Sequence, residues 1–301
     1  MFMGTPDFAV SSLKRLVEDG HTICGVFTQP DKPKNRGMKL TFSAVKEYAL
    51  TQDLEVYQPL SMKTEDSLAL LQGLKPDLTV VAAYGQILPQ AVLDVAPLGS
   101  INVHSSLLPT YRGAAPINWA ILDGLTTTGV TIMHMAKALD AGDIISTVET
   151  AIDPQETAPE LTMRLAELGA ALLSETVVAM GNGTAMRTPQ DHEAHTYAPM
   201  LSRELSPLDF TKDSLTLHNQ VRGLIPWPCA VAELQERTLK VFKTHVGEAT
   251  TASAGTIVSA DKFGIGVACS DGKILVITEI QAQGSKRMAA ADYLRGKPMQ
   301  V

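Results

Sequence analysis

The chain has 301 residues, 45% of them hydrophobic, and a formal net charge of −7 at pH 7. This apolar content can fill a large core, and the length favours two domains over one. No run of 18 apolar residues occurs, which excludes a membrane-spanning helix.

The chain opens with MFMGTPDFAV, which has neither the basic flank nor the cleavage site of a signal peptide. Its three cysteines, Cys24, Cys229 and Cys269, are scattered and lack metal-ligand spacing. They are interpreted as packing residues in a reducing compartment. We therefore expect a cytoplasmic protein without a metal site.

Short apolar runs alternate with helical patterns through the first half of the chain. The strand-like runs are 21–29, 54–59, 76–84, 100–104 and 129–135. The helical patterns are 6–19, 42–51, 64–73, 116–123 and a long one at 158–181. This alternation predicts βαβ units, and hence an α/β domain with a mostly parallel sheet.

The pattern changes after the long helix. A polar stretch rich in Thr and Pro follows, then one helical segment near 211–224 and several short strands with turns between them. Closely spaced short strands predict a small β-barrel. We therefore predict a catalytic domain at 1–184, a linker at 185–203 and a barrel domain at 204–301. The last 102 residues carry 12 Lys and Arg against 10 Asp and Glu, a mildly basic balance that is compatible with a nucleic-acid partner.

The strand SINVH places two polar side chains on one face, because residues two apart in a strand point the same way. These residues are Asn102 and His104. The later motif LDAGD offers Asp140 and Asp143, separated from that strand by one helix and one strand. A connection of that kind can return a loop to the tip of an earlier strand.

An amide, an imidazole and a carboxylate together favour transfer to a nucleophile supplied by the substrate. Asn102 can donate to an oxygen that becomes negative, and Asp140 can orient His104 or hold it protonated. No nucleophile-elbow glycine pattern surrounds Ser105 and Ser106. The alternative is that Asn102 and His104 only cap the strand and bind loop backbone.

The loop TQPDKPKNRGMKL carries four cations within eight positions: Lys32, Lys34, Arg36 and Lys39. It is either a solvated surface loop or a segment that contacts phosphates. The earlier MGTPDF lacks the G-x-G-x-x-G pattern that dinucleotide sites use, which argues against a nicotinamide enzyme.

These motifs resemble those of the methionyl-tRNA formyltransferase family. The segments that carry the resemblance are FMGTPDFAV, TQPDKPKNRGMKL, VVAAYGQILP, INVHSSLLPTYRGAAPINWAI, LDAGD and PWP, in that order along almost the whole chain. The segment SSLLPTYRGAAPINWAI alone marks the broader group of enzymes that use 10-formyltetrahydrofolate.

The resemblance implies a doubly wound, Rossmann-like formyltransferase domain followed by an OB-like barrel that faces tRNA. It implies that Asn102, His104 and Asp140 form the catalytic trio, and that the amino group of methionyl-initiator tRNA attacks the formyl carbon of 10-formyltetrahydrofolate. It further implies that the protein is a monomer. We expect Asp143, in the same motif as Asp140, to structure the loop, and we expect no membrane partner.

Two segments match the family's folate contacts and one matches its tRNA contacts. The implied folate residues are Ser106, Leu107, Leu108, Pro109, Tyr84, Gly85, Gln86, Ile87 and Leu88. The implied tRNA residues are Lys32, Lys34, Arg36 and Lys39, with Arg36 the strongest candidate. Two alternatives stay open: a related formyltransferase acting on an amino-sugar nucleotide, and a non-catalytic RNA-binding protein.

Overall fold

The computed structural model describes residues 1–34 and 39–301. Within them the chain forms two compact units. The first consists of Met1–Gly113, Thr128–Thr150 and Thr162–Tyr197, and the second of Ala114–Thr127, Ala151–Leu161 and Ala198–Val301. The chain therefore passes from one unit to the other several times, whereas the sequence pattern predicts one crossing near residues 185–203.

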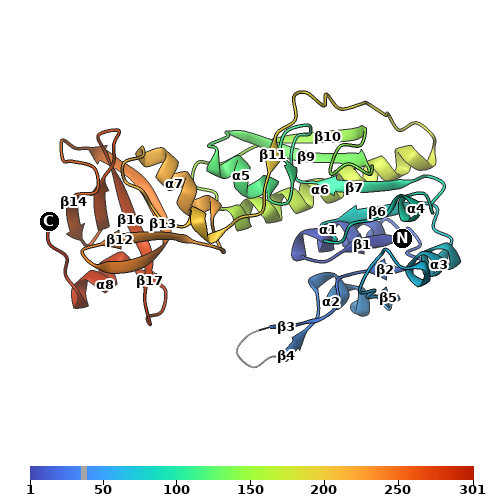
Figure 1. Cartoon of the computed structure of the whole chain (residues 1–301), viewed down its shortest axis with the longest axis horizontal. Helices are drawn as coiled ribbons and strands as arrows, with labels where there is room; N and C mark the ends of the chain where they lie inside the picture. Colours follow the sequence, from blue (N-terminus) through green and yellow to red (C-terminus); the bar gives the residue numbers. More distant parts are fainter. Residues whose placement is uncertain (35–38) are drawn as a thin grey trace. The chain divides into compact units, whose positions relative to one another are not determined.

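The first unit is built on a seven-stranded sheet (Figure 1). Its order is β10 (Ile144–Ala151), β9 (Thr127–His134), β7 (Ser100–His104), β6 (Thr79–Ala82), β1 (Phe2–Gly4), β2 (Val26–Phe27) and β5 (Val56–Tyr57). The strands from β5 to β7 are parallel, and β9 runs antiparallel to β7. The prediction of a mostly parallel sheet is confirmed.

The strand order reverses between β1 and β6. From β1 the chain continues to β2 and β5 on one side, and it then returns to β6 and β7 on the other. In open α/β sheets, ligands bind outside the carboxyl ends of the strands at such a reversal. There the Thr5 hydroxyl donates to the carbonyl oxygen of Tyr84 at 2.8 Å, which joins the loops that follow β1 and β6.

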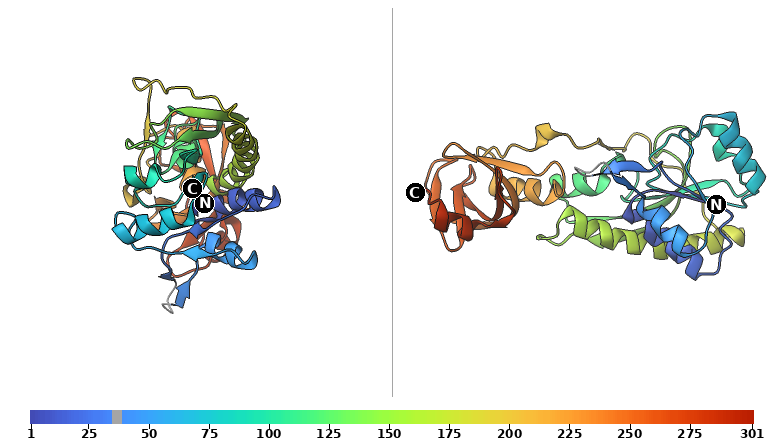
Figure 2. Two further views of the ribbon diagram at one scale, coloured as in Figure 1. Left: turned by 90° about the vertical axis from the view of Figure 1, so that its right-hand side faces the viewer. Right: turned by 90° about the horizontal axis from the view of Figure 1, so that it is seen from below.

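Helices cover both faces of this sheet, because its central strands carry apolar side chains on both faces. The helices are α1 (Asp7–Glu18), α2 (Ala44–Thr51), α3 (Glu65–Leu74), α4 (Gln90–Leu93) and α6 (Ala158–Gly181). Met3 and Phe27 pack with Leu71 of α3 and Val92 of α4. Gly4 points the opposite way, where a Cβ would lie 2.7 Å from Ala9 of α1. Figure 2 shows α1 and α6 on one side of the sheet and α3 on the other.

The second unit contains an antiparallel sheet, which confirms a β domain after the α/β domain. Its path is β12 (Ala230–Leu234), β13 (Arg237–Ala249), β16 (Lys273–Ala282), β15 (Gly264–Ala268) and β14 (Ile257–Asp261), with β17 (Met288–Ala289) paired to β16. Leu217 of α7 (Ser214–Gly223) and Leu294 of α8 (Ala290–Gly296) pack against its buried side chains. Three register shifts along the β13–β16 ladder bend the long strand β13.

The remaining elements are short. They are the hairpin of β3 (Lys32–Lys34) and β4 (Lys39–Thr41), the pair β8 (Arg112–Gly113) and β11 (Tyr197–Ala198), helix α5 (Pro116–Leu122) and the 3₁₀ turn η1 (Arg203–Leu205). In the part of the chain that the structure describes, none of the helices is long and apolar enough to cross a membrane.

Candidate active site

Strand β7 presents Asn102 and His104 on one face of the sheet, as the alternation of the strand predicts. The opposite face is occupied by α6, since a Cβ on its Gly169 would lie 3.0 Å from Cγ1 of Val103. In the ladder to β9, Asn102 lies opposite Met133 and His104 opposite Thr131. The face that is not covered by α6 therefore carries the amide and the imidazole.

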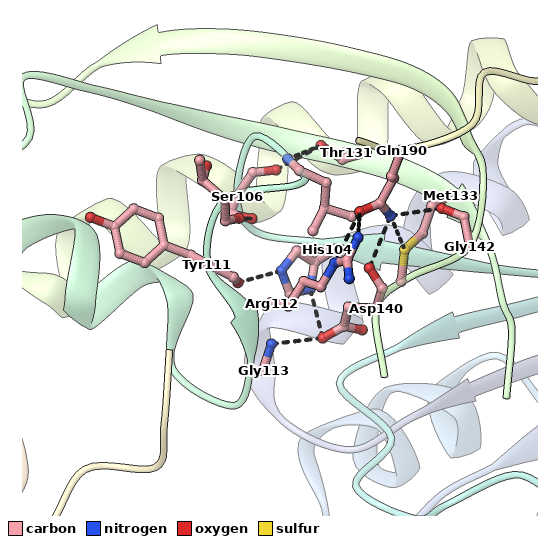
Figure 3. A network of polar contacts seen from close by, with 12 residues as sticks. His104, Ser106, Tyr111, Arg112, Gly113, Thr131, Met133, Asp140, Gly142 and Gln190 are labelled. Atoms are coloured by element: carbon pink, nitrogen blue, oxygen red, sulfur yellow. Dashed lines mark hydrogen bonds and ion pairs between the residues drawn. The ribbon is translucent and has the colours of Figure 1, made fainter. Parts of the chain in front are cut away.

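His104 is buried and both of its ring nitrogens face oxygen atoms (Figure 3). Its Nε2 lies 2.9 Å from the carbonyl oxygen of Tyr111. A carbonyl oxygen only accepts hydrogen bonds, so Nε2 carries a hydrogen. Its Nδ1 lies 3.7 Å from Oδ2 of Asp140, and the two side chains are only 6% and 11% exposed. The carboxylate oxygen therefore faces the imidazole in a region largely shielded from water.

The amide of Asn102 is half-buried and has no hydrogen-bond partner in the described part of the chain. Each residue beside it in the sheet, Val81 and Met133, is apolar. A half-buried amide of this kind can still donate to a ligand oxygen. Asn102 is thus the member of the trio whose amide remains available to form hydrogen bonds with a substrate.

Asp140 lies in the loop between β9 and β10, which folds back over the sheet. Strand β9 ends opposite Ile101, below His104, so the loop must reverse direction to reach the imidazole. Asp140 has a φ of +48°, a left-handed conformation that Asp adopts more readily than most residues. Its Oδ2 accepts a hydrogen bond of 2.9 Å from the backbone N–H of Gly113. This bond aims the carboxylate at His104.

Gly142 is required by the same reversal. A Cβ at this position would lie 1.8 Å from the carbonyl oxygen of His134, which no side chain can tolerate. Asp143 accepts a hydrogen bond from Arg187 at 2.6 Å, and its own carbonyl oxygen accepts from the N–H of His134 at 2.9 Å. Asp143 points to Arg187 rather than to His104.

Two residues without an assigned role in the sequence analysis also hold this loop. Gln190 donates from Nε2 to the carbonyl oxygens of Asp140 and Gly142, at 2.9 and 2.7 Å. Its Oε1 accepts from Arg112 Nε and Nη2, at 3.0 and 2.6 Å. Arg112 falls within the motif SSLLPTYRGAAP, whereas Gln190 lies in a polar stretch without periodicity. Only the three-dimensional fold brings them together.

The implied folate loop follows β6 at the reversal of strand order. Tyr84 is 2% exposed, its hydroxyl has no hydrogen-bond partner among residues 1–34 and 39–301, and burial raises its pKa to about 12. The Gln86 side chain binds Met62 N at 3.0 Å and Pro59 O at 2.9 Å. Gly85 takes a φ of +83°. Of this loop, Ile87 is the most exposed side chain, at 76%.

The implied SLLP segment forms a tight turn at the end of β7. Ser106 donates from Oγ to the carbonyl oxygen of Thr110 at 2.7 Å. Thr131 donates to the Ser106 carbonyl at 2.7 Å and accepts from the Leu108 N–H at 3.2 Å. Leu107 lies over Gly129, and the Leu108–Pro109 peptide bond is cis. These bonds fix the backbone beside His104.

The basic loop is described only in part. Lys32 and Lys34 belong to strand β3 and Lys39 to strand β4, with Lys34 opposite Lys39 in the hairpin. Arg36 lies outside the described residues. Next to the hairpin, Lys46 binds Asp31 at 2.6 Å and so ties α2 to the start of β3.

The three cysteines lie within or beside the packed interior of the protein. Cys229 and Cys269 are buried thiols, Cys24 is half-buried, and burial raises the pKa of Cys269 to about 11. Two histidines of the polar stretch after α6, His192 and His195, are exposed. In the described ranges, no group of three or more His, Cys, Asp or Glu residues is placed to hold a metal ion.

Comparisons with known proteins agree with this architecture. Residues 1–177 match the family described as formyl transferase, and residues 200–298 match its C-terminal domain. Methionyl-tRNA formyltransferase of Clostridioides difficile is 44% identical, over 100% of this chain and 97% of its own length. The Bacillus subtilis enzyme of the same name is 46% identical, over 98% of this chain and 94% of its own.

Solved structures share the fold at much lower identity. An N-formyltransferase of Helicobacter canadensis, in complex with folinic acid and dTDP-3-aminofucose, has a TM-score of 0.68 and 18% identity over 93% of this chain and 98% of its own. HypX of Aquifex aeolicus with tetrahydrofolic acid has a TM-score of 0.60 and 20% identity over 82% of this chain and 43% of its own. With both domains matched and full-length relatives above 40% identity, the chain belongs to the methionyl-tRNA formyltransferase family.

Proposed function

We propose that this protein transfers the formyl group of 10-formyltetrahydrofolate to the α-amino group of methionyl-initiator tRNA. The observation that carries the proposal is the placement of Asp140 Oδ2 3.7 Å from His104 Nδ1, on the sheet face that also carries Asn102. These three side chains supply a donor, an acid–base group and a fixed negative charge within one buried region.

The reaction needs little more than these groups. The amine nitrogen of the aminoacyl-tRNA attacks the formyl carbon, and the carbonyl oxygen becomes negative in a tetrahedral intermediate. The bond from that carbon to folate N10 then breaks, the amine nitrogen loses one proton and N10 gains one. No covalent intermediate with the protein is required, which suits a site whose trio contains no Ser or Cys nucleophile.

Each member of the trio has a separate task in this scheme. The amide of Asn102 donates to the developing oxyanion, because it is the group without a partner in the described residues. His104 stabilises the same charge and can move the proton. Asp140 holds the imidazole in position, because its Oδ2 atom faces Nδ1 of the ring. Preorganised donors of this kind typically contribute about 3–4 kcal/mol to transition-state stabilisation.

The folate co-substrate would bind at the reversal of strand order, where open α/β sheets usually bind ligands. The backbone of Tyr84 to Leu88, which follows β6, and the SLLP turn of Ser106 to Pro109, which follows β7, would contact it. Backbone groups of these loops would bind the pterin, and the exposed Ile87 would cover its flat face. The Tyr84 side chain is buried in the core, and the Gln86 amide binds backbone groups of Met62 and Pro59. These two side chains therefore shape the loop.

The tRNA would contact the cations of the basic loop, Lys32, Lys34, Arg36 and Lys39. Strands β3 and β4, which carry Lys32, Lys34 and Lys39, extend away from the seven-stranded sheet (Figure 1). Four cations in eight positions suit a polyphosphate backbone better than a small sugar nucleotide. The mildly basic C-terminal domain would provide a second contact with the tRNA.

The decisive experiment supplies 10-formyltetrahydrofolate with methionyl-tRNA and, separately, with an amino-sugar nucleotide. We expect formylmethionyl-tRNA in the first reaction and no formylated sugar in the second. Formylation of the sugar alone would replace the proposal with the sugar-nucleotide alternative. Binding of tRNA without formylation of either acceptor would instead support a non-catalytic RNA-binding protein.

A further inference from the structure

We propose that Gln190, held by Arg112, is a positioning residue that fixes the Asp140 carboxylate against His104. This inference rests on the proposed function of the trio, because it assigns a residue outside the trio to the same reaction. It also gives a role to part of the segment 185–203, for which the sequence predicts only a connection between domains.

The orientation of the Gln190 amide follows from its neighbours. Arg112 has only donors, so the Gln190 atom at 3.0 and 2.6 Å from its Nε and Nη2 must be the oxygen. The carbonyl groups of Asp140 and Gly142 have only acceptors, so the atom at 2.9 and 2.7 Å from them must be the amide nitrogen. All four bonds fit one amide orientation, and the guanidinium prevents the amide from flipping.

These bonds act on the backbone that aims the carboxylate. Gln190 donates hydrogen bonds to the backbone carbonyl group of Asp140 and to that of Gly142, two residues further on. Between them the chain makes a turn that requires a positive φ at Asp140 and the absence of a side chain at Gly142. Such a backbone needs outside contacts to persist, since residues in left-handed conformations are strained. Gln190 supplies two of these contacts from a side chain that is 5% exposed.

Burying the Arg112 guanidinium costs free energy, because a charged group loses its contact with water. It is 7% exposed, and its partners are the Gln190 oxygen and Nδ1 of His192, at 3.0 Å. No carboxylate in the described part of the chain lies within ion-pair distance of it. Its bonds to Gln190 are charge-assisted, and such bonds are stronger and more directional than bonds between neutral groups. Its neighbour in sequence, Gly113, donates to the Asp140 carboxylate.

Gln190, which is bound by Arg112, therefore binds the backbone carbonyl groups of the loop, while the Gly113 N–H binds the Asp140 carboxylate (Figure 3). Thr188, two residues before Gln190, exchanges two backbone hydrogen bonds with Ile144 at the end of the same loop, at 2.8 and 2.9 Å. These two bonds help to place Gln190 beside the loop.

The test compares Gln190→Met with the wild-type protein in steady-state formylation of methionyl-tRNA. Met keeps the length and volume of the side chain but loses all four hydrogen bonds. We expect kcat to fall about 10²-fold, because a small misplacement of a catalytic group costs about that much. The KM values for tRNA and folate should stay within about twofold, because no binding contact is removed.

A double-mutant cycle distinguishes positioning from a general loss of structure. If Gln190 acts through Asp140, Gln190→Met should have almost no further effect on kcat in an Asp140→Asn background. An equal loss of kcat in both backgrounds, or wild-type kcat in the single variant, would overturn the proposal. Arg112→Lys keeps the charge but not the paired bonds to the Gln190 oxygen. Arg112→Lys should also lower kcat while leaving both KM values nearly unchanged. If Gln190→Met does not fold, this variant provides the test.

Arg187→Ala is the matched control. This side chain lies on the same segment and binds the same loop, but through the exposed pair with Asp143. We expect its kcat within about twofold of wild type, since exposed ion pairs contribute little. A wild-type protein that formylates no acceptor would refute the proposed function, whereas an active wild type with a fully active Gln190→Met refutes only the positioning role.

Discussion

The Nδ1 atom of His104 lies 3.7 Å from Oδ2 of Asp140, although one residue ends strand β7 and the other lies in the loop after β9. The loop reaches His104 by turning back over the sheet, with Gly113, Arg112 and Gln190 holding it there. The contact between His104 and Asp140 thus depends on the backbone of the loop. Changes to that backbone should affect catalysis as strongly as changes to the two side chains.

Removing the Asn102 amide should abolish most formyl transfer without unfolding the protein. The side chain has no hydrogen-bond partner in the described residues, so Asn102→Ala leaves no protein group unpaired. We expect kcat to fall about 10²–10³-fold, the usual cost of losing one oxyanion donor. Steady-state formylation and a thermal melt check this. Asn182→Ala, which removes an exposed amide, is the control, and near-wild-type turnover by Asn102→Ala would contradict the assignment.

Gly142→Ala should both destabilise the protein and inactivate it. The added methyl group would meet the His134 carbonyl oxygen at 1.8 Å, so the loop that carries Asp140 has to move. We expect a loss of about 1–3 kcal/mol in the free energy of unfolding, as in other overpacked sites, together with a large drop in kcat. Urea unfolding and formylation assays measure the two effects.

Gly73→Ala provides the opposite control. Gly73 lies in helix α3, and a Cβ there meets nothing within 4 Å. This substitution should stabilise the protein by about 0.5–1 kcal/mol and leave turnover unchanged. A Gly142→Ala protein with wild-type stability and turnover would show that the loop is not as constrained as its contacts indicate.

Arg36→Ala should weaken the use of tRNA and spare folate. If Arg36 contacts a phosphate, its loss should raise the KM for tRNA several-fold and reduce the slope of log affinity against log salt by about 0.9. Filter binding at several salt concentrations and steady-state kinetics test both. Lys14→Ala is a suitable control, because Lys14 is an exposed cation of helix α1. An unchanged KM and salt slope would remove Arg36 from the tRNA contacts.

The pair of Asp31 and Lys46 should make stability depend on pH. Burial acts to raise the pKa of Asp31, but hydrogen bonds from Lys46 and Gln58 outweigh it and the pKa lies below its usual value. The stabilisation is therefore present above the unfolded-state pKa of about 3.9 and disappears as the pH falls through the lower, folded-state value.

Asp31→Asn should accordingly lower the free energy of unfolding at neutral pH by up to about 1 kcal/mol. The difference from wild type should shrink as the pH falls below the unfolded-state pKa and through the lower, folded-state pKa of Asp31. Urea titrations across this range measure it. A difference that stays constant with pH would show that the carboxylate is not stabilised by its partners.

Much of the local structure could be predicted from the sequence, because it depends on short-range pattern. The helix predicted at 158–181 has these bounds, and the alternation in SINVH places Asn102 and His104 as expected. The side chains that this helix buries follow no single spacing: Leu173 is fully buried, whereas Leu168 and Leu172 are only partly buried. A helix that crosses a sheet changes its contact face along its length, which a fixed spacing does not capture.

The parts that could not be predicted depend on long-range contacts. The apolar run 129–135 identifies a strand but not its direction, and β9 proved antiparallel to β7. The reversal of the Asp140 loop has a sequence sign only in its glycine, Gly142. Gln190 lies in a polar segment whose composition resembles that of a solvated connector, so only its partners in space reveal its contribution.

The most direct test of the account is the single-turnover rate of formyl transfer by Asp140→Asn. Asn keeps the shape, tolerates the positive φ and still accepts from the Gly113 N–H, so only the negative charge beside His104 is lost. We predict a rate about 10²–10⁴-fold below wild type, as when the charge that orients a catalytic histidine is removed elsewhere, with an unchanged melting temperature. A rate within about twofold of wild type would contradict the claim that this carboxylate and imidazole act together in catalysis.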